Sequence, residues 1–296
     1  MAVNVIRSGP FTTVQDAGRR GYRAGGVPLS GAMDPLALRV ANLLVGNSEG
    51  AAGLEFAVAG PEIEFSHDTL VAVGGAECEG LPNWKPVIVH AGDRIQVGRC
   101  LRGARGYLSI AGGIAVTPVL GSRSTYLRGA FGGLDGRTLR NGDVMLIGED
   151  GAVSGRLARF ETGPTWRIDA RILPAYSPSP TVRVLRGAQA NEFGTVFYET
   201  EFRVSSQSDR MGLRLEGERL LRATGEELLS AAVAPGTVQV PPDGQPVVLM
   251  ADAQTIGGYP QVAHVISVDL PVMAQVQPGD HVRFTAVSLH DAHRLA

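Results

Sequence analysis

Three glycine-rich segments carry polar and charged side chains of the types that bind and activate small polar substrates. They cover residues 12–34, 120–137 and 205–260. Arginine side chains bind carboxylates and phosphates through paired hydrogen bonds, and a carboxylate can orient water or accept a proton. Because site residues often lie on loops held by a rigid scaffold, we predict that these segments form one polar pocket.

In the first segment, Asp16 is the predicted catalytic carboxylate. Gln15, Arg19 and Tyr22 are predicted to bind the substrate. A structural alternative is that Asp16 caps a turn and pairs with Arg19. For Asp34, a role as the N-cap of a following helix is favoured.

The second segment contains Ser122, Arg123 and Ser124, which we predict to bind the substrate. Serine hydroxyls and the backbone N–H groups of a glycine-rich loop can together form an anion-binding nest. The segment lacks the lysine and the following helix of a phosphate-binding loop. The structural alternative is a tight loop between two strands.

In the third segment, polar side chains follow an apolar run at residues 247–250. Polar groups at the end of a core strand are good site candidates. The alternative for Asp209 and Arg210 is a local ion pair. The predicted residues are the catalytic Asp209 and Asp252 and the substrate-binding Arg210, Gln254 and Tyr259.

The composition excludes several classes of chemistry. The 27 basic residues contain one lysine, Lys85, so 27 − 1 = 26 are arginine. No Gly-Lys pair is present for a Walker A loop, and Lys85 lies in a poor context for carrying biotin or pyridoxal phosphate. A net charge of −2 provides no field for a polyanion, so no nucleic-acid partner is predicted.

Metal, disulfide and membrane signals are also missing from the sequence. The six histidines form no ligand cluster, and no metal site is predicted. Cys78 and Cys100 lack CxxC spacing and are interpreted as reduced thiols in or near the core. No apolar run approaches the roughly 18 residues of a membrane span, and the N-terminus shows no secretory signal. We therefore expect a cytoplasmic protein without a membrane partner.

The hydrophobic pattern predicts a mainly β protein. Residues 62–65, 94–97 and 281–284 alternate polar and apolar side chains, as half-buried strands do. Four continuous apolar runs predict strands buried on both faces, and glycine makes up 39 of 296 residues, which indicates many turns. These runs cover residues 70–73, 87–89, 144–147 and 247–250.

One helix is clear in the pattern, over residues 34–44. Asp34 is its predicted N-cap, Pro35 suits the first helical position and Gly46 can end it. A second helix is predicted over residues 188–198, and the tail 288–296 is expected to fray. The predicted apolar face of the first helix consists of Leu36, Val40, Leu43 and Leu44.

A Gly-Asp turn recurs before three short strands, at Gly92-Asp93, Gly142-Asp143 and Gly279-Asp280. Its presence in both halves favours two related barrels. Residues 151–180 mix Gly, Pro, Ser and scattered charge. We therefore predict a first domain at 1–150, a linker at 151–180 and a second domain at 181–296.

The motifs also resemble one family along nearly the whole chain, in order. They are TTVQDAGRRGY, GVPLSGAMD, ANLLVGN, RGYLSIAGGI, LGSRSTYL, SSQSDRMGLRLEG and PPDGQPVVLMADAQTIGGYP, with Leu54-Glu55 between them. In these motifs the chain resembles the allophanate hydrolase subunit 2 or KipA-like group, which includes the C subunits of 5-oxoprolinases and biotin-dependent carboxyltransferase domains.

This resemblance implies tandem cyclophilin-like β-barrels with a few short helices. It implies one component of a multi-chain, ATP-dependent 5-oxoprolinase that converts 5-oxo-L-proline to L-glutamate, and a chain that is inactive alone. The implied partners are a KipI-like protein, which is the B subunit of the enzyme, and its A subunit. ATP is then a co-substrate of the complex, and the polar pocket lies at the interface with the KipI-like partner.

Two other functions remain open under the same resemblance. One is a biotin-dependent carboxyltransferase component acting on urea or a related amide. The other is a KipA-like regulatory protein that binds and counteracts a kinase inhibitor.

Overall fold

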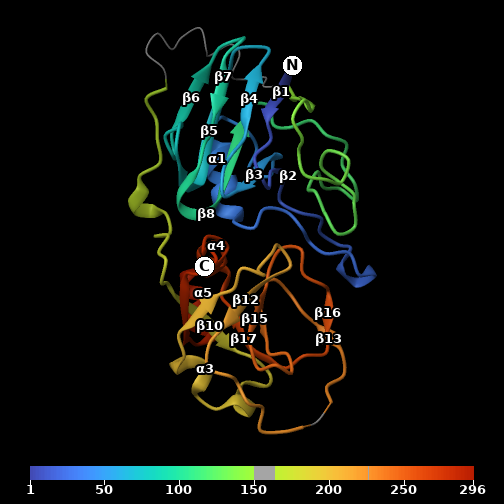
Figure 1. Cartoon of the computed structure of the whole chain (residues 1–296), viewed down its shortest axis with the longest axis vertical. Helices are drawn as coiled ribbons and strands as arrows, with labels where there is room; N and C mark the ends of the chain where they lie inside the picture. The colour runs from blue at the N-terminus through green and yellow to red at the C-terminus, as the bar shows by residue number, and fades with distance from the viewer. Residues whose placement is uncertain (150–163, 226) are drawn as a thin grey trace. The chain divides into compact units, whose positions relative to one another are not determined.

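The computed structural model describes residues 1–149, 164–225 and 227–296, which form two compact units (Figure 1). The first unit consists of Met1–Arg19 and Ser30–Pro174, and the second of Arg20–Leu29 and Ala175–Ala296. The predicted linker 151–180 lies partly outside the described residues. In its described part, the chain passes into the second unit after Pro174. The membership of residues 20–29 in the second unit was not predicted.

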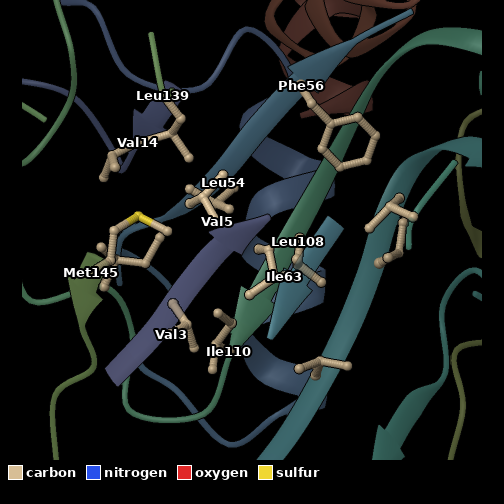
Figure 2. Close-up of a cluster of buried hydrophobic side chains, with 14 of the residues drawn as sticks. Val3, Val5, Val14, Leu54, Phe56, Ile63, Leu108, Ile110, Leu139 and Met145 are labelled. Carbon is tan, nitrogen blue, oxygen red and sulfur yellow. The ribbon is translucent and has the colours of Figure 1, made fainter. Parts of the chain in front are cut away.

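Two antiparallel sheets form the first unit. One has the strand order β7-β4-β1-β9 and the other the order β2-β3-β8-β5-β6. Alternating side chains of both sheets, among them Val3, Ile63 and Leu108, meet in one core (Figure 2). The strands are β1 (Ala2–Arg7), β2 (Thr13–Gln15), β3 (Gly53–Ala57), β4 (Glu62–Phe65), β5 (Thr69–Cys78), β6 (Pro86–Val89), β7 (Arg94–Gln96), β8 (Cys100–Ile110) and β9 (Val144–Leu146).

The second unit is a closed barrel with the strand order β10-β17-β14-β15-β12-β11-β18. Its ends meet where β10 pairs with β18 in parallel. A separate two-stranded sheet joins β13 and β16. The strands are β10 (Thr181–Arg186), β11 (Phe202–Val204), β12 (Gly212–Glu216), β13 (Ala231–Ala232), β14 (Thr237–Gln239), β15 (Val247–Leu249), β16 (Ile256–Gly257), β17 (Gln261–Val265) and β18 (His281–Ala286).

Strands predominate in the described residues, the second unit is a closed barrel and the helices are few and short, so the predicted mainly β fold class is confirmed. None of these helices is long and apolar enough to span a membrane. The α-helices are α1 (Pro35–Leu44), α3 (Val196–Glu199), α4 (Leu270–Ala274) and α5 (Leu289–Leu295). The 3-10 helices are η1 (Arg23–Gly25), η2 (Ala170–Ile172), η3 (Ala190–Phe193) and η4 (Ser267–Asp269).

Helix α1 starts as the sequence predicts. The side chain of Asp34 accepts a hydrogen bond from the Ala37 N–H at 2.9 Å, and Pro35 occupies the first turn. The predicted apolar face is partly wrong. Leu44 is buried and Val40 packs against the same cluster, but Leu43 is 49% exposed, and the fully buried positions are Ala37 and Ala41. The helix lies so close to β5 that a Cβ on Gly74 would approach the Ala37 carbonyl oxygen to 2.7 Å. Only small side chains fit between these backbones.

Three other expectations need correction. Strand β9 is not buried on both faces, because Val144 and Leu146 are exposed at the edge of its sheet. The helix predicted at 188–198 is split into η3 and α3, with Gly194 at a φ of +63° between them. The tail is helical rather than frayed: α5 begins where the Ser288 hydroxyl accepts the Asp291 N–H.

The predicted Gly-Asp turns are confirmed and share one geometry. Each glycine has a φ between +87° and +95°. Each aspartate carboxylate accepts a hydrogen bond, 2.7 to 2.9 Å long, from the backbone N–H three residues earlier. Each glycine N–H also donates to a carbonyl of a neighbouring strand at 2.7 or 2.8 Å. The turns at Gly92-Asp93, Gly142-Asp143 and Gly279-Asp280 lead into β7, β9 and β18.

Candidate functional site

The carboxylate of Asp16 is the centre of a buried polar cluster in the first unit. Its Oδ1 accepts the hydroxyls of Ser122 at 2.6 Å and Ser124 at 2.5 Å, and the Gly18 N–H at 2.8 Å. Its Oδ2 accepts the Arg123 N–H at 2.5 Å. The predicted anion-binding loop therefore holds an anion that the chain itself supplies, at the end of β2.

Arg19 and Gln15 lie beside this cluster and are fully buried. The Arg19 guanidinium donates to the Ser124 carbonyl and lies 4.9 Å from the centre of the Phe131 ring, a cation–π contact. Gln15 Nε2 donates to the Thr13 hydroxyl at 3.0 Å. These contacts bring together six predicted residues: Gln15, Asp16, Arg19, Ser122, Arg123 and Ser124.

In the second unit, Arg210 and Asp252 form a mostly buried ion pair. The guanidinium donates from Nε to Oδ2 at 2.9 Å and from Nη2 to Oδ1 at 3.2 Å. Their side chains are 14% and 5% exposed. The Asp252 N–H also donates to the Arg210 carbonyl at 2.9 Å. The arginine fork is therefore fixed by contacts from both its backbone and its side chain.

Asp209 has a different environment from its neighbour. It is exposed, and its Oδ1 accepts the backbone N–H groups of Met211 at 2.8 Å and Gly212 at 3.1 Å. The aspartate that pairs with Arg210 is Asp252, 42 residues away in the sequence. The local ion pair considered from the sequence is replaced by this longer-range pair.

The two remaining predicted residues of the third segment, Gln254 and Tyr259, both contact a buried glutamine. Gln239 is 1% exposed, and its Oε1 accepts from Gln254 Nε2 at 3.4 Å. Its Nε2 donates to the Tyr259 carbonyl at 3.4 Å. The Tyr259 side chain itself is 48% exposed. Gln239 was not among the predicted site residues, although it lies in the same polar segment.

Tyr22 lies in the stretch Arg20–Leu29, which belongs to the second unit. Its side chain is 41% exposed, and its carbonyl accepts the Gly25 N–H at 3.0 Å. The following Arg23 donates a side-chain hydrogen bond to the Val233 carbonyl. The first predicted segment is therefore divided between the units, and the two described polar clusters lie one in each unit.

Sequence reasoning missed a buried network that supports the Asp16 cluster. The Tyr107 hydroxyl donates to Glu55 at 2.8 Å and accepts the Asp34 N–H at 2.8 Å. Glu55 also accepts the Met33 N–H at 2.8 Å. Burial raises the pKa of Tyr107 well above its usual value. One sequence signal was available: Glu55 interrupts an otherwise apolar strand.

The same network fixes the chain before α1. The Ala32 N–H donates to the Asp16 carbonyl at 3.0 Å, one residue from the Met33 N–H that Glu55 holds. The backbone on both sides of the Arg20–Leu29 stretch is therefore anchored in the first unit. Among the described residues, no group of three His, Cys, Asp or Glu side chains could hold a metal ion.

Comparison with known proteins gives full-length relatives. The chain is 41% identical to the C subunit of 5-oxoprolinase from Escherichia coli strain K12, over 98% of this chain and 93% of the relative. It is 38% identical to the corresponding 5-oxoprolinase protein of Haemophilus influenzae, over 96% and 90% of the two chains.

A solved structure is also similar over almost the entire chain. The urea carboxylase of Kluyveromyces lactis matches with a TM-score of 0.89 and 30% identity, covering 99% of this chain and 28% of that longer chain. The family model for the carboxyltransferase domain, subdomain A and B, matches residues 25–286. Since this match covers most of both units, the chain belongs to the family of carboxyltransferase domains with subdomains A and B.

Proposed function

We propose that this chain is a component of an ATP-dependent 5-oxoprolinase, which converts 5-oxo-L-proline to L-glutamate together with a KipI-like B subunit and the A subunit of the enzyme. The observation that carries this proposal is the 41% identity to the C subunit of E. coli 5-oxoprolinase over 93% of that relative. A full-length match supports the same role in the same kind of complex.

The proposed chemistry is activation of a lactam. A lactam carbonyl is a poor electrophile, and transfer of a phosphoryl group from ATP to its oxygen makes the carbonyl carbon easier to attack by water. Ring opening with loss of phosphate then yields glutamate. We assign ATP to the assembled complex, since the chain has no Gly-Lys pair of a phosphate-binding loop.

The contacts divide the predicted carboxylates into two roles. Both oxygens of Asp16 accept hydrogen bonds inside the chain, and both oxygens of Asp252 accept from Arg210. We therefore propose that these two residues position their neighbours. Asp209 is exposed and binds its backbone partners through Oδ1 alone. It is our candidate for the group that orients water or accepts a proton.

Arg210 is the proposed anchor for the substrate carboxylate. Its guanidinium is planar and its orientation is fixed by Asp252, so the ordering entropy of an arginine side chain is already lost before substrate binds. Gln254 and Tyr259 are proposed to contact the amide and ring of the substrate. Gln15, Arg19, Tyr22, Ser122, Arg123 and Ser124 stay predictions as substrate-binding residues.

Reconstitution of the complex tests this proposal. The A and B subunits together with this chain should release glutamate from 5-oxo-L-proline in the presence of ATP. Omission of this chain should abolish that release. Undiminished release without it would exclude the proposed role, and tight binding to the KipI-like partner with no turnover would favour the regulatory function instead.

A biotin-dependent carboxyltransferase component is the second candidate. It is supported by the similarity to the urea carboxylase of K. lactis. Under this proposal the assembled protein should show urea-dependent consumption of carboxybiotin. The same preparation assayed with 5-oxo-L-proline and ATP distinguishes the two functions.

A further inference from the structure

Two cysteines lie side by side on adjacent strands of the five-stranded sheet in the first unit. Cys78 ends β5, Cys100 begins β8, and the two residues are directly opposite in the antiparallel ladder. Their Sγ atoms lie 3.6 Å apart. Both residues are buried, at 8% and 9% exposure.

The ladder places this pair where side chains approach most closely. The Glu79 N–H donates to the Arg99 carbonyl at 3.0 Å, while the Cys100 N–H donates to Val58 instead of Cys78. Bonded and non-bonded pairs alternate in an antiparallel ladder, so Cys78 and Cys100 form a non-hydrogen-bonded pair. Such pairs have Cα atoms about 4.5 Å apart, within the range of about 4.4–6.8 Å that disulfides span.

The two thiols differ in their surroundings. Cys78 Sγ lies 3.2 Å from the Ala76 carbonyl oxygen, which favours the protonated thiol. The hydrogen bond that Cys78 donates to Cys100 lowers the pKa of Cys100, and the same bond together with burial raises the pKa of Cys78. Cys100 therefore has the greater thiolate character.

We propose that Cys78 and Cys100 are a modification site that forms a reversible intramolecular disulfide with hydrogen peroxide as the oxidant. The Cys100 thiolate attacks peroxide, the O–O bond breaks, and Cys100 sulfenic acid and hydroxide result. Cys78 sulfur then attacks the Cys100 sulfur, the S–O bond breaks, and the oxygen leaves as water. Two thiols and one peroxide give one disulfide and two waters.

The product would close a covalent loop around residues 79–99. This loop includes β6 of one sheet and β7 of the other. Oxidation is therefore expected to stabilise the first unit against unfolding, because a crosslink limits the freedom of the unfolded chain. Neither cysteine belongs to the two polar clusters, so this proposal does not depend on the proposed function.

Peptide mapping of the full chain tests the proposal directly. Trypsin releases Cys100 in the tripeptide 100–102, and Cys78 stays in the peptide 40–94 because the lysine inside it precedes proline. After peroxide treatment and alkylation of remaining thiols, these two peptides should appear linked, about 2 Da lighter than their sum. Dithiothreitol should separate them again.

Two variants control the order of the steps. In Cys78→Ser, where a hydroxyl can still donate a hydrogen bond to Cys100, Cys100 should accumulate as a sulfenic acid that dimedone traps. Cys100→Ser should show much less trapping at Cys78. Equal trapping in both variants would overturn the assignment of Cys100 as the attacking thiol. Because these variants can lose stability, the wild-type map carries the main test: alkylation of both thiols after peroxide, or disulfides between two chains, would overturn the proposal.

Discussion

Arg210 and Asp252 hold each other through two parallel hydrogen bonds across 42 residues of sequence. One residue lies in the turn before β12 and the other in the turn after β15, two adjacent strands of the barrel. The pairing of these two strands therefore fixes the orientation of Arg210, the proposed anchor for an anionic substrate.

Asp252→Asn should destabilise the second unit by about 3 kcal/mol, because a mostly buried guanidinium loses the carboxylate that balances its charge. The matched control is Glu216→Gln, which breaks the exposed pair with Arg203 and should cost less than about 1 kcal/mol. Urea unfolding followed by circular dichroism measures both. Similar losses in the two variants would contradict the special role of the buried pair.

Asp16→Asn should lower the free energy of unfolding by about 2–3 kcal/mol. Both oxygens of the carboxylate accept hydrogen bonds, and the amide places an NH₂ group, itself a donor, against one set of these donors. Ser122→Ala removes the hydrogen bond to Asp16 and the one that Ser122 accepts from the Ser124 N–H, and should cost about 1–2 kcal/mol. A double-mutant cycle on urea midpoints checks the coupling. Fully additive losses would show that Asp16 and Ser122 do not act together.

Gly142→Ala should destabilise the first unit by about 1–2 kcal/mol, because an alanine at a φ of +88° is strained although its Cβ meets nothing within 4 Å. Gly142→Asn should cost less, since asparagine tolerates this conformation. Gly225→Ala is the control: it also has open space but no positive φ, so it should change stability by at most about 1 kcal/mol, towards greater stability. Thermal unfolding compares the three variants.

His264 should make the second unit less stable in acid. Burial lowers the pKa of its imidazole, so the folded protein favours the neutral form more than the unfolded chain does. The stabilisation is complete above the unfolded pKa of about 6.5 and is lost as the pH falls through the folded value. His264→Gln should reduce the slope of melting temperature against pH below about 6.5.

The control for this titration is His290→Gln, which changes an exposed histidine in the C-terminal helix. It should leave the slope close to that of the wild type. If His264→Gln has the same slope as the wild type, the half-buried imidazole does not govern acid stability.

Local sequence patterns predicted the helices and strands well, but they predicted the contacts between these elements less well. Alternation and capping located β4, β18 and the start of α1, because these signals depend on neighbours in sequence. The buried face of α1 was predicted only in part, because it depends on how closely Gly74 lets the helix approach β5. No periodicity within the helix contains that information.

The polar clusters show the same division. The sequence indicated that the segment 120–137 could bind an anion, but the anion in the structure is Asp16, whose partner Ser122 is 106 residues away. Likewise, the sequence offered the adjacent Asp209 as a partner for Arg210, whereas the partner in the structure is Asp252, 42 residues away. Pairing across such separations is decided by strand order in the folded units, which local composition does not encode.

The assignment of Arg20–Leu29 to the second unit has a consequence for synthesis of the chain. These ten residues leave the ribosome early, whereas the rest of their unit, from Ala175 onward, follows much later. Domains generally fold as units during translation. The first unit is therefore expected to fold while Arg20–Leu29 still lacks the rest of the second unit. A chain truncated at Pro174 should therefore be cut by protease between Arg20 and Leu29 faster than the completed chain.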